Sequence, residues 1–98
     1  MEGFGIFKWN DGKVYSGDWS LSKMEGKGKM IWSDGRSYIG TYQNGLKHGI
    51  GTFVYSDGRK YFGSWNQGLQ HGKGLYTDLK GQEIGGEWFQ GVMKEKKL

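Results

Sequence analysis

The chain of 98 residues contains no cysteine, no proline and no alanine. Without cysteine it can form neither a disulfide framework nor a sulfur-ligated zinc or iron–sulfur site, and cysteine usage leaves its redox compartment undetermined. No apolar run approaches the ~18 residues that span a bilayer, and the first residues lack the charged-then-apolar pattern of a secretory signal. We therefore expect a single domain with a cytoplasmic location.

Aliphatic side chains are scarce, and aromatic ones take their place. Leu, Ile, Val and Phe together number 19, just under the ~20% level that favours disorder, but the net charge is only +4. Phe, Tyr and Trp supply 16 rings among 20 glycines. Each ring can bury roughly 150–250 Å², so we expect a folded protein whose apolar area is mainly aromatic.

A 23-residue repeat organises the sequence: Tyr15, Tyr38, Tyr61 and Ile84 are evenly spaced and begin matching segments. Glycine holds the third place of each segment and an aromatic residue the fifth, and glycines recur at the eighth, twelfth and fourteenth places of most copies. This periodicity indicates a repeat protein. The predicted division of the one domain is a partial repeat, three full repeats, a partial repeat and a basic tail: 2–14, 15–37, 38–60, 61–83, 84–92 and 93–98.

The composition favours strands over helices, because alanine is absent, glycine is frequent and no 3.6-residue periodicity precedes the tail. Runs such as Tyr61–Trp65 and Gly51–Tyr55 put aromatic residues two apart, on one face of a strand. Asp-Gly pairs between such runs are a strong hairpin signal. Each repeat is predicted to form two antiparallel strands, which gives about eight strands with the partial ends.

The glycines suggest a register for these strands, since glycine inside a strand normally weakens it. If the third place of one strand pairs with the sixteenth place of the other, a ring lies flat over bare backbone and covers its hydrogen bonds. The predicted face is a checkerboard of rings and glycines. Two examples are Trp65 between Gly51 and Gly74, and Phe53 between Gly40 and Gly63.

Two segments show the repeat in its fullest form. Residues 38–51 read Tyr-Ile-Gly-Thr-Tyr-Gln-Asn-Gly-Leu-Lys-His-Gly-Ile-Gly, and residues 61–74 follow the same pattern. The pattern closely resembles the MORN repeat, Tyr-x-Gly-x-Trp/Tyr-x-x-Gly-x-x-His-Gly-x-Gly, and the resemblance covers residues 2–92. It implies an all-β fold: an elongated, twisted, single-layer antiparallel sheet built as a meander of hairpins.

The resemblance also implies a function. MORN repeats look like interaction platforms of cytoskeletal, ciliary and membrane-junction proteins, are appended to lipid kinases and a lysine methyltransferase, and carry no catalysis themselves. We therefore expect a non-catalytic scaffold without cofactor, metal or nucleic acid, associated with the cytoskeleton or a cilium. The alternatives are a peripheral membrane module for anionic phosphoinositide lipids, or an accessory module of an enzyme.

The sequence departs from this pattern in three copies. Ser22 and Glu25 stand where the family prefers Gly and His, so the loop of residues 20–25 is expected to differ from the other loops. Residues 78–81 lack both the aromatic residue before the turn and the Asp of the turn. The last copy passes into Lys and Glu at residues 94–97, a decay that terminal repeats often show.

The aromatic face is the main candidate binding surface. In a single layer the rings are the core, yet a partly exposed groove of rings is also typical of protein interfaces. A partner helix or peptide is expected there, opposite the face of Ile31, Ile39, Val54 and Phe62. The predicted groove residues are Tyr15, Trp19, Trp32, Tyr38, Tyr42, Phe53, Tyr55, Tyr61 and Trp65.

A row of basic residues is a second candidate. Lys13, Arg36 and Arg59 follow successive Asp-Gly turns, so stacked repeats would align them along one edge, where they could contact acidic lipid headgroups. An ordinary solvated turn is the alternative, because aspartates two places earlier nearly cancel the charge: Asp11, Asp34 and Asp57.

Metal, nucleotide and catalytic sites find little support. His48 and His71 lie one repeat apart, about 9–10 Å, which is awkward for sharing one zinc, so a local hydrogen bond in each loop is the predicted role. The Gly-x-Gly pairs complete no phosphate-binding motif, and no nucleophile, base and orienting group recur together.

The strand edges suggest a further mode of association. The first strand, near residues 3–9, and the last, near residues 84–89, are expected to be the two edges of the sheet. Two molecules could pair head to tail there, or the edges could be covered within a larger complex.

Overall fold

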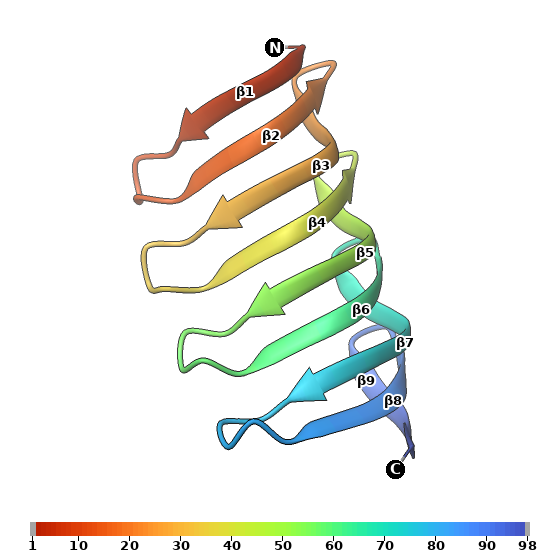
Figure 1. Ribbon diagram of the computed structural model, residues 1–98. Helices are drawn as coiled ribbons and strands as arrows, with labels where there is room; N and C mark the ends of the chain where they lie inside the picture. Colours follow the sequence, from red (N-terminus) through yellow and green to blue (C-terminus); the bar gives the residue numbers. More distant parts are fainter. Residues whose placement is uncertain (1, 98) are drawn as a thin grey trace.

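The computed structural model describes residues 2–97, with side chains through residue 92. These residues form a single antiparallel sheet whose strand order follows the chain from one edge to the other (Figure 1). The strands are β1 (Gly3–Lys8), β2 (Val14–Ser20), β3 (Lys23–Ile31), β4 (Ser37–Gln43), β5 (Leu46–Val54), β6 (Lys60–Asn66), β7 (Leu69–Thr77), β8 (Glu83–Phe89) and β9 (Val92–Lys97). The predicted all-β meander is confirmed, with one strand more than the eight expected.

The ninth strand occupies most of the segment that was predicted to be a basic tail. A two-residue turn at Gln90 and Gly91 (φ 48° and 90°) lets β9 pair with β8. Strand pairing uses backbone groups, so β9 can pair with β8 although residues 94–97 lack the glycines that the repeat has there. The prediction that residues 84–89 form an edge was therefore wrong: the edges are β1 and β9. Head-to-tail association stays a prediction.

The predicted register was also wrong, by two residues at the glycine row and by four beyond the shift that follows it within each repeat. The third place of each repeat pairs with the fourteenth, and Trp65 lies opposite Gly49 on one side but Gln70 on the other. A shift of two or four residues leaves every side chain on its predicted face, so the division into two faces holds while the checkerboard does not. Like residues gather in rows instead: Gly63 lies between Gly51 and Gly74, and Phe53 between Tyr38 and Tyr61.

The glycine row is where each strand bends around a ring. A Cβ atom added to Gly51 would lie 2.1 Å from the hydroxyl oxygen of Tyr38, and one added to Gly40 would lie 2.5 Å from the Cα atom of Gly51. No side chain fits at either position. Directly after the row, the β4–β5 ladder shifts register between Gly40 and Tyr42, and the strands curve away at this end (Figure 1).

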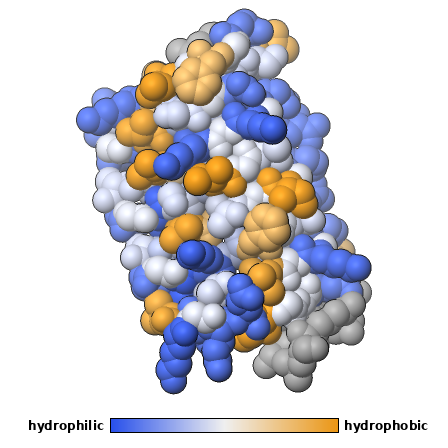
Figure 2. Space-filling view, viewed as in Figure 1, coloured by the Kyte–Doolittle hydropathy of each residue, from blue (hydrophilic) through white to orange (hydrophobic). Residues whose placement is uncertain are grey.

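The bend gives the sheet a concave and a convex face. The rings line the concave face, while the convex face carries exposed apolar side chains, among them Phe4, Ile39, Ile50 and Phe62. In Figure 2 such apolar side chains are interspersed with hydrophilic ones. Because a single layer has no second sheet, the core of the protein is the concave face itself.

The loops at the curved end share one geometry. Two residues with positive φ join the strands of each hairpin, as at Asn44 (φ 52°) and Gly45 (φ 83°). Leu21 (φ 51°) and Ser22 (φ 64°) adopt the same conformation, so the expectation of a different loop at residues 20–25 was wrong. Strand pairing on both sides imposes the turn even where serine replaces the glycine that favours it.

The histidines form hydrogen bonds with loops, as predicted, but each bonds to the next loop of the sheet and not within its own. Nδ1 of His48 accepts a hydrogen bond from the backbone N–H of Gln67 in the next loop, at 3.4 Å, and Nδ1 of His71 does the same for Gln90. Glu25 replaces the histidine in the earlier repeat, and its carboxylate accepts from the N–H of Asn44 at 3.2 Å. An acceptor at this place therefore links each loop to the next.

We expect the glycine row to tolerate no side chain. Gly51→Ala places a methyl group against the fully buried Tyr38, and overpacking of this kind costs about 2–3 kcal/mol of unfolding free energy. Chemical denaturation followed by tryptophan fluorescence measures the loss. Ile50→Ala, the neighbouring residue on the exposed convex face, is the control and should cost under about 1 kcal/mol. Equal losses would contradict the packing described here.

Candidate functional site: the concave aromatic face

A continuous spine of edge-to-face ring contacts runs along the concave face. Within β4, the ring centroids of Tyr38 and Tyr42 are 5.2 Å apart, although four residues of straight strand would separate them by about 13 Å. The bend at the glycine row makes this contact, and Tyr38 then contacts Trp65 of the next repeat at 5.4 Å. The spine consists of Trp19, Tyr15, Tyr42, Tyr38, Trp65, Tyr61 and Trp88.

The polar ends of the spine rings bond to the backbone. The hydroxyl of Tyr38 donates to the carbonyl of Thr41 at 3.1 Å, and Tyr15 and Tyr61 make the equivalent bond. Nε1 of Trp65 donates to the carbonyl of Gly51 at 3.1 Å. Tyr42 takes the tryptophan place in its repeat, and its buried hydroxyl has no hydrogen-bond partner among the described residues.

Burial of the spine shifts the tyrosine pKa values upward. Desolvation raises the pKa of Tyr15 and Tyr61 to about 12, and it raises the pKa of Tyr38 and Tyr42 further. Burial of the spine therefore favours the neutral form of its hydroxyls.

The structure brings all nine predicted groove residues together on this face, but it buries most of them. Tyr15, Tyr38 and Tyr61 are fully buried, and Tyr42, Phe53 and Trp65 are at most 8% exposed. Only Trp19, Trp32 and Tyr55 are partly exposed, and they pack against the buried rings. The buried rings build the groove, whereas the half-exposed rings form the surface that a partner can contact.

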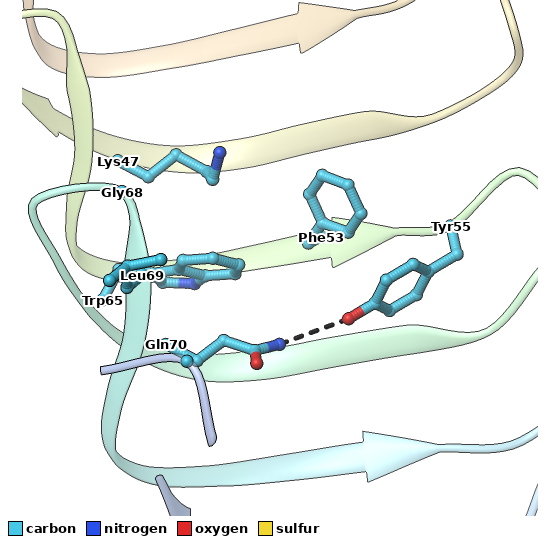
Figure 3. Close-up of a pocket in the computed structure, with 8 residues that line it drawn as sticks. Lys47, Phe53, Tyr55, Trp65, Gly68, Leu69 and Gln70 are labelled. Atoms are coloured by element: carbon cyan, nitrogen blue, oxygen red, sulfur yellow. Dashed lines mark hydrogen bonds between the residues drawn. The ribbon is translucent and has the colours of Figure 1, made fainter. Parts of the chain in front are cut away.

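Two hollows lie on the concave face at equivalent places two repeats apart. One, of about 310 Å³, is lined by Phe7, Trp9, Trp19 and Ser22. The other, of about 230 Å³, contains the residues 46 positions later: Phe53, Tyr55, Trp65 and Gly68. Leu69 and Gln70 of β7, Lys47 of β5 (Figure 3) and Gly91 complete its lining.

Lys47 is the one residue of this hollow that can carry charge. Its ammonium lies 5.4–5.8 Å from the centroids of four rings, those of Trp32, Tyr38, Phe53 and Trp65. Burial, followed by the positive charge of Arg36, lowers its pKa. Beside it, Gln70 donates a hydrogen bond to the hydroxyl of Tyr55 at 3.3 Å (Figure 3).

Sequence reasoning missed Lys47 and Gln70 as groove residues. They share the tenth place of the repeat with Met24, so the place shows no common residue type that would draw attention to it. The missing signal was the register: with the correct pairing, Lys47 lies opposite Tyr42 and Gln70 opposite Trp65, on the ring-bearing face.

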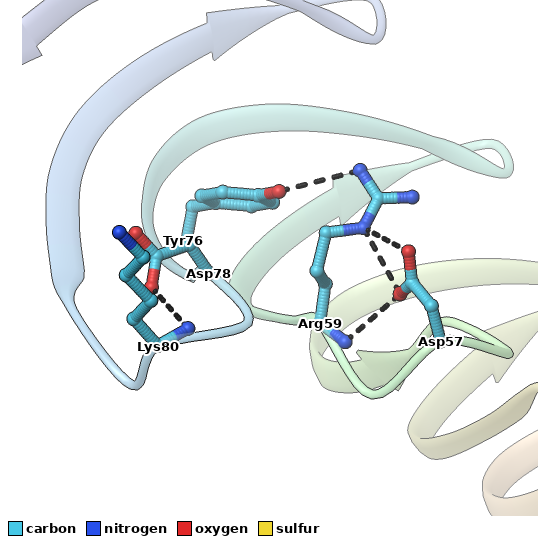
Figure 4. Close-up of polar contacts among 5 residues, drawn as sticks. All are labelled: Asp57, Arg59, Tyr76, Asp78 and Lys80. Carbon is cyan, nitrogen blue, oxygen red and sulfur yellow. Dashed lines mark hydrogen bonds and ion pairs between the residues drawn. The ribbon is translucent and has the colours of Figure 1, made fainter.

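The predicted basic row does align along the turn edge, but its charge is largely engaged. Nε of Arg59 contacts Asp57 at 2.8 Å, and its Nη1 donates to Tyr76 (Figure 4). Its guanidinium also lies 4.8 Å from the ring centroid of Tyr55. Arg36 pairs with Asp34 and stacks on Trp32 in the same way. Lys13 lies over Trp9, at 4.7 Å.

The last turn of this edge keeps its shape without the usual residues. Asp78 occupies the aromatic place, and its carboxylate accepts from the backbone N–H of Lys80 at 2.9 Å (Figure 4) and from the backbone N–H of Gln82, also at 2.9 Å. The N–H of Gly81 bonds to the Asp78 carbonyl as in the other turns. The carboxylate thus stabilises the turn from a different position in the loop.

The convex face is hollowed as well, behind the glycine row. Its larger hollow, of about 620 Å³, is lined by Phe4, Ile39 and Ile50 together with Asp18, Lys27 and Lys29. Charges of both signs lie in it, and Phe4 is the one aromatic residue among the described residues that line it.

The chain belongs to the MORN repeat family, which it matches at residues 1–14, 15–35, 38–58 and 61–82. MORN repeats are non-catalytic modules that generally mediate protein or membrane interactions. No curated protein sequence matches the chain. Within residues 2–97, no helical segment has the length and apolarity that a membrane crossing requires.

Tyr38→Phe and Tyr42→Phe should have different effects on stability. Tyr38→Phe removes a hydrogen bond and should cost about 1 kcal/mol. Tyr42→Phe removes a buried hydroxyl without a partner and should be neutral or stabilising by up to about 1 kcal/mol. Urea denaturation of both variants compares them directly, and equal destabilisation would contradict the assignment.

Alkaline conditions should unfold the spine. Above about pH 10 the tyrosines of the unfolded chain lose protons that the native chain retains, so stability falls as pH rises, by up to about 1.4 kcal/mol per pH unit for each spine tyrosine. Thermal melting between about pH 9 and 11 measures the fall. Absorbance of tyrosinate should rise together with unfolding; a full rise in the folded protein would contradict this.

Proposed function

We propose that the protein is a non-catalytic scaffold whose concave face binds a helix or peptide segment of a partner protein. The observation that carries this proposal is the pair of equivalent ring-lined hollows, bordered by the half-exposed rings of Trp9, Trp19 and Tyr55. Aromatic residues in such half-exposed positions are typical anchors of protein interfaces.

The spacing of the hollows suits a segment that crosses the strands. Two repeats correspond to four strand spacings, or about 19 Å. A helix of about 13 residues covers that length, and apolar side chains at its two ends would reach both hollows. The spine beneath is buried and rigid, so the groove is formed before the partner arrives.

Binding of anionic phosphoinositide lipids through Lys13, Arg36 and Arg59 is the alternative. The ion pairs of Arg36 and Arg59 with their neighbouring aspartates offset the charge that such lipids require. The concave face is therefore the favoured surface. Association with the cytoskeleton or a cilium, and service as an accessory module of an enzyme, remain compatible with this scaffold.

Site-specific photo-crosslinking tests which face binds. A photoreactive amino acid replaces either Tyr55 on the concave face or Phe62 on the convex face. The side chains of both residues are at least partly exposed. Irradiation in cells that express the full protein should crosslink a partner to position 55. The same partner should not be crosslinked to position 62. Binding of that purified partner should then weaken with Tyr55→Ser and persist with Phe62→Ser, both checked by thermal melting.

Adducts from position 62 alone would overturn the proposal. The proposal would also be overturned if the protein bound vesicles in proportion to their phosphoinositide content. That binding would have to weaken with salt and with the double variant Arg36→Gln/Arg59→Gln, and be unchanged by Tyr55→Ser. That result would establish the lipid alternative.

A further inference from the structure

Lys47 occupies an unusual position for a cation. Its backbone lies on β5 opposite Tyr42, and its side chain extends over the rings to the wall of the hollow of about 230 Å³ (Figure 3). The ion pairs found among the described residues join Arg36 to Asp34 and Arg59 to Asp57, and neither includes Lys47. The ammonium is thus half-buried against aromatic rings, and no carboxylate among the described residues pairs with it.

The fold does not need a cation at this place. Met24 and Gln70 stand at the equivalent position of the neighbouring repeats, and both lie on strands with the same pairing as β5. Their spine rings pack with nearly the same geometry: Tyr15–Trp19 at 5.1 Å and Tyr61–Trp65 at 5.2 Å. Ring faces attract a cation, but removing an ammonium from water without a counter-charge opposes folding.

The surroundings of Lys47 indicate what kind of anion fits. Phe53, Trp65 and Leu69 give the hollow an apolar wall, so the anion must arrive with apolar groups. A phosphate, with its higher charge, is best held by several cations, yet the nearby Arg36 is already paired with Asp34. A single carboxylate matches a single ammonium.

We propose that Lys47 anchors an Asp or Glu side chain of the segment that binds the concave face, with an apolar neighbour of that residue filling the adjacent hollow. This inference rests on the proposed function and specifies its partner: an acidic, apolar protein segment. Gln70 at the hollow's rim supplies an amide N–H group that can reorient toward the same carboxylate.

Peptide selection tests this without knowledge of the natural partner. The full chain is immobilised and screened against random phage-displayed peptides of about 16 residues, long enough to cross both hollows. Selected peptides should share an Asp or Glu next to an apolar residue. Peptides selected on the Lys47→Met variant should lack this acidic preference. Peptides selected on Lys73→Met, which changes an exposed lysine of the convex face, should show it.

A double-mutant cycle measures the coupling between Lys47 and the acidic side chain of a selected peptide. Replacing the peptide's Asp or Glu by its amide should weaken binding to the native chain by roughly 30-fold and leave binding to Lys47→Met nearly unchanged. Lys47→Met should also raise the melting temperature, because Met24 shows that the place accepts this side chain. A clear fall in melting temperature would assign Lys47 a structural role and overturn the inference.

The outcomes separate the two proposals. Peptides that bind without an acidic preference but are lost with Tyr55→Ser overturn the role of Lys47 and leave the concave face as the binding surface. Peptides whose binding is unchanged by Tyr55→Ser overturn both the role of Lys47 and the concave face as the binding surface. Failure to select any peptide does the same.

Discussion

The fold depends on one packing relation, a tyrosine ring lying over a row of glycines. The ring fills the space in which a Cβ atom of Gly28, Gly51 or Gly74 would stand, and its hydroxyl reaches a backbone carbonyl just past the bend. A single sheet cannot bury apolar area against a second layer, so each strand must wrap around its own rings. The glycines of the row follow from that requirement, whereas those of the turns, such as Gly45, are favoured by a positive φ.

This relation also decides which residues face a partner. Tyr15, Tyr38 and Tyr61 are fully buried, so they set the shape of the groove without contacting anything in it. Residues outside the ring spine, such as Tyr55 and Lys47, border the hollows and provide the accessible chemistry. Recurring places therefore build the groove and the rings that border its hollows, and the tenth place of the repeat, which differs between copies, sets its charge.

The sequence analysis predicted the sheet and its faces because period-two alternation survives a register error of two or four residues. It missed the register because a ring beside a glycine and a ring above a glycine look alike in one dimension: Trp65 was expected to flank Gly74, whereas Tyr61 covers Gly74 from above. It missed β9 because backbone pairing needs no repeat signature. Lys47 escaped because its importance lies in the absence of a nearby carboxylate, a three-dimensional property.

The same reasoning explains how a repeat of fixed architecture can acquire specificity. Met24, Lys47 and Gln70 occupy one place in successive repeats, on β3, β5 and β7, and the ring geometry beneath them hardly changes. A substitution at this place alters the charge of the groove without altering its frame, so selection for a partner and selection for folding act on different residues. In the binding mode that we propose, a half-buried ammonium at such a place lowers stability slightly, and a partner's carboxylate restores it on binding.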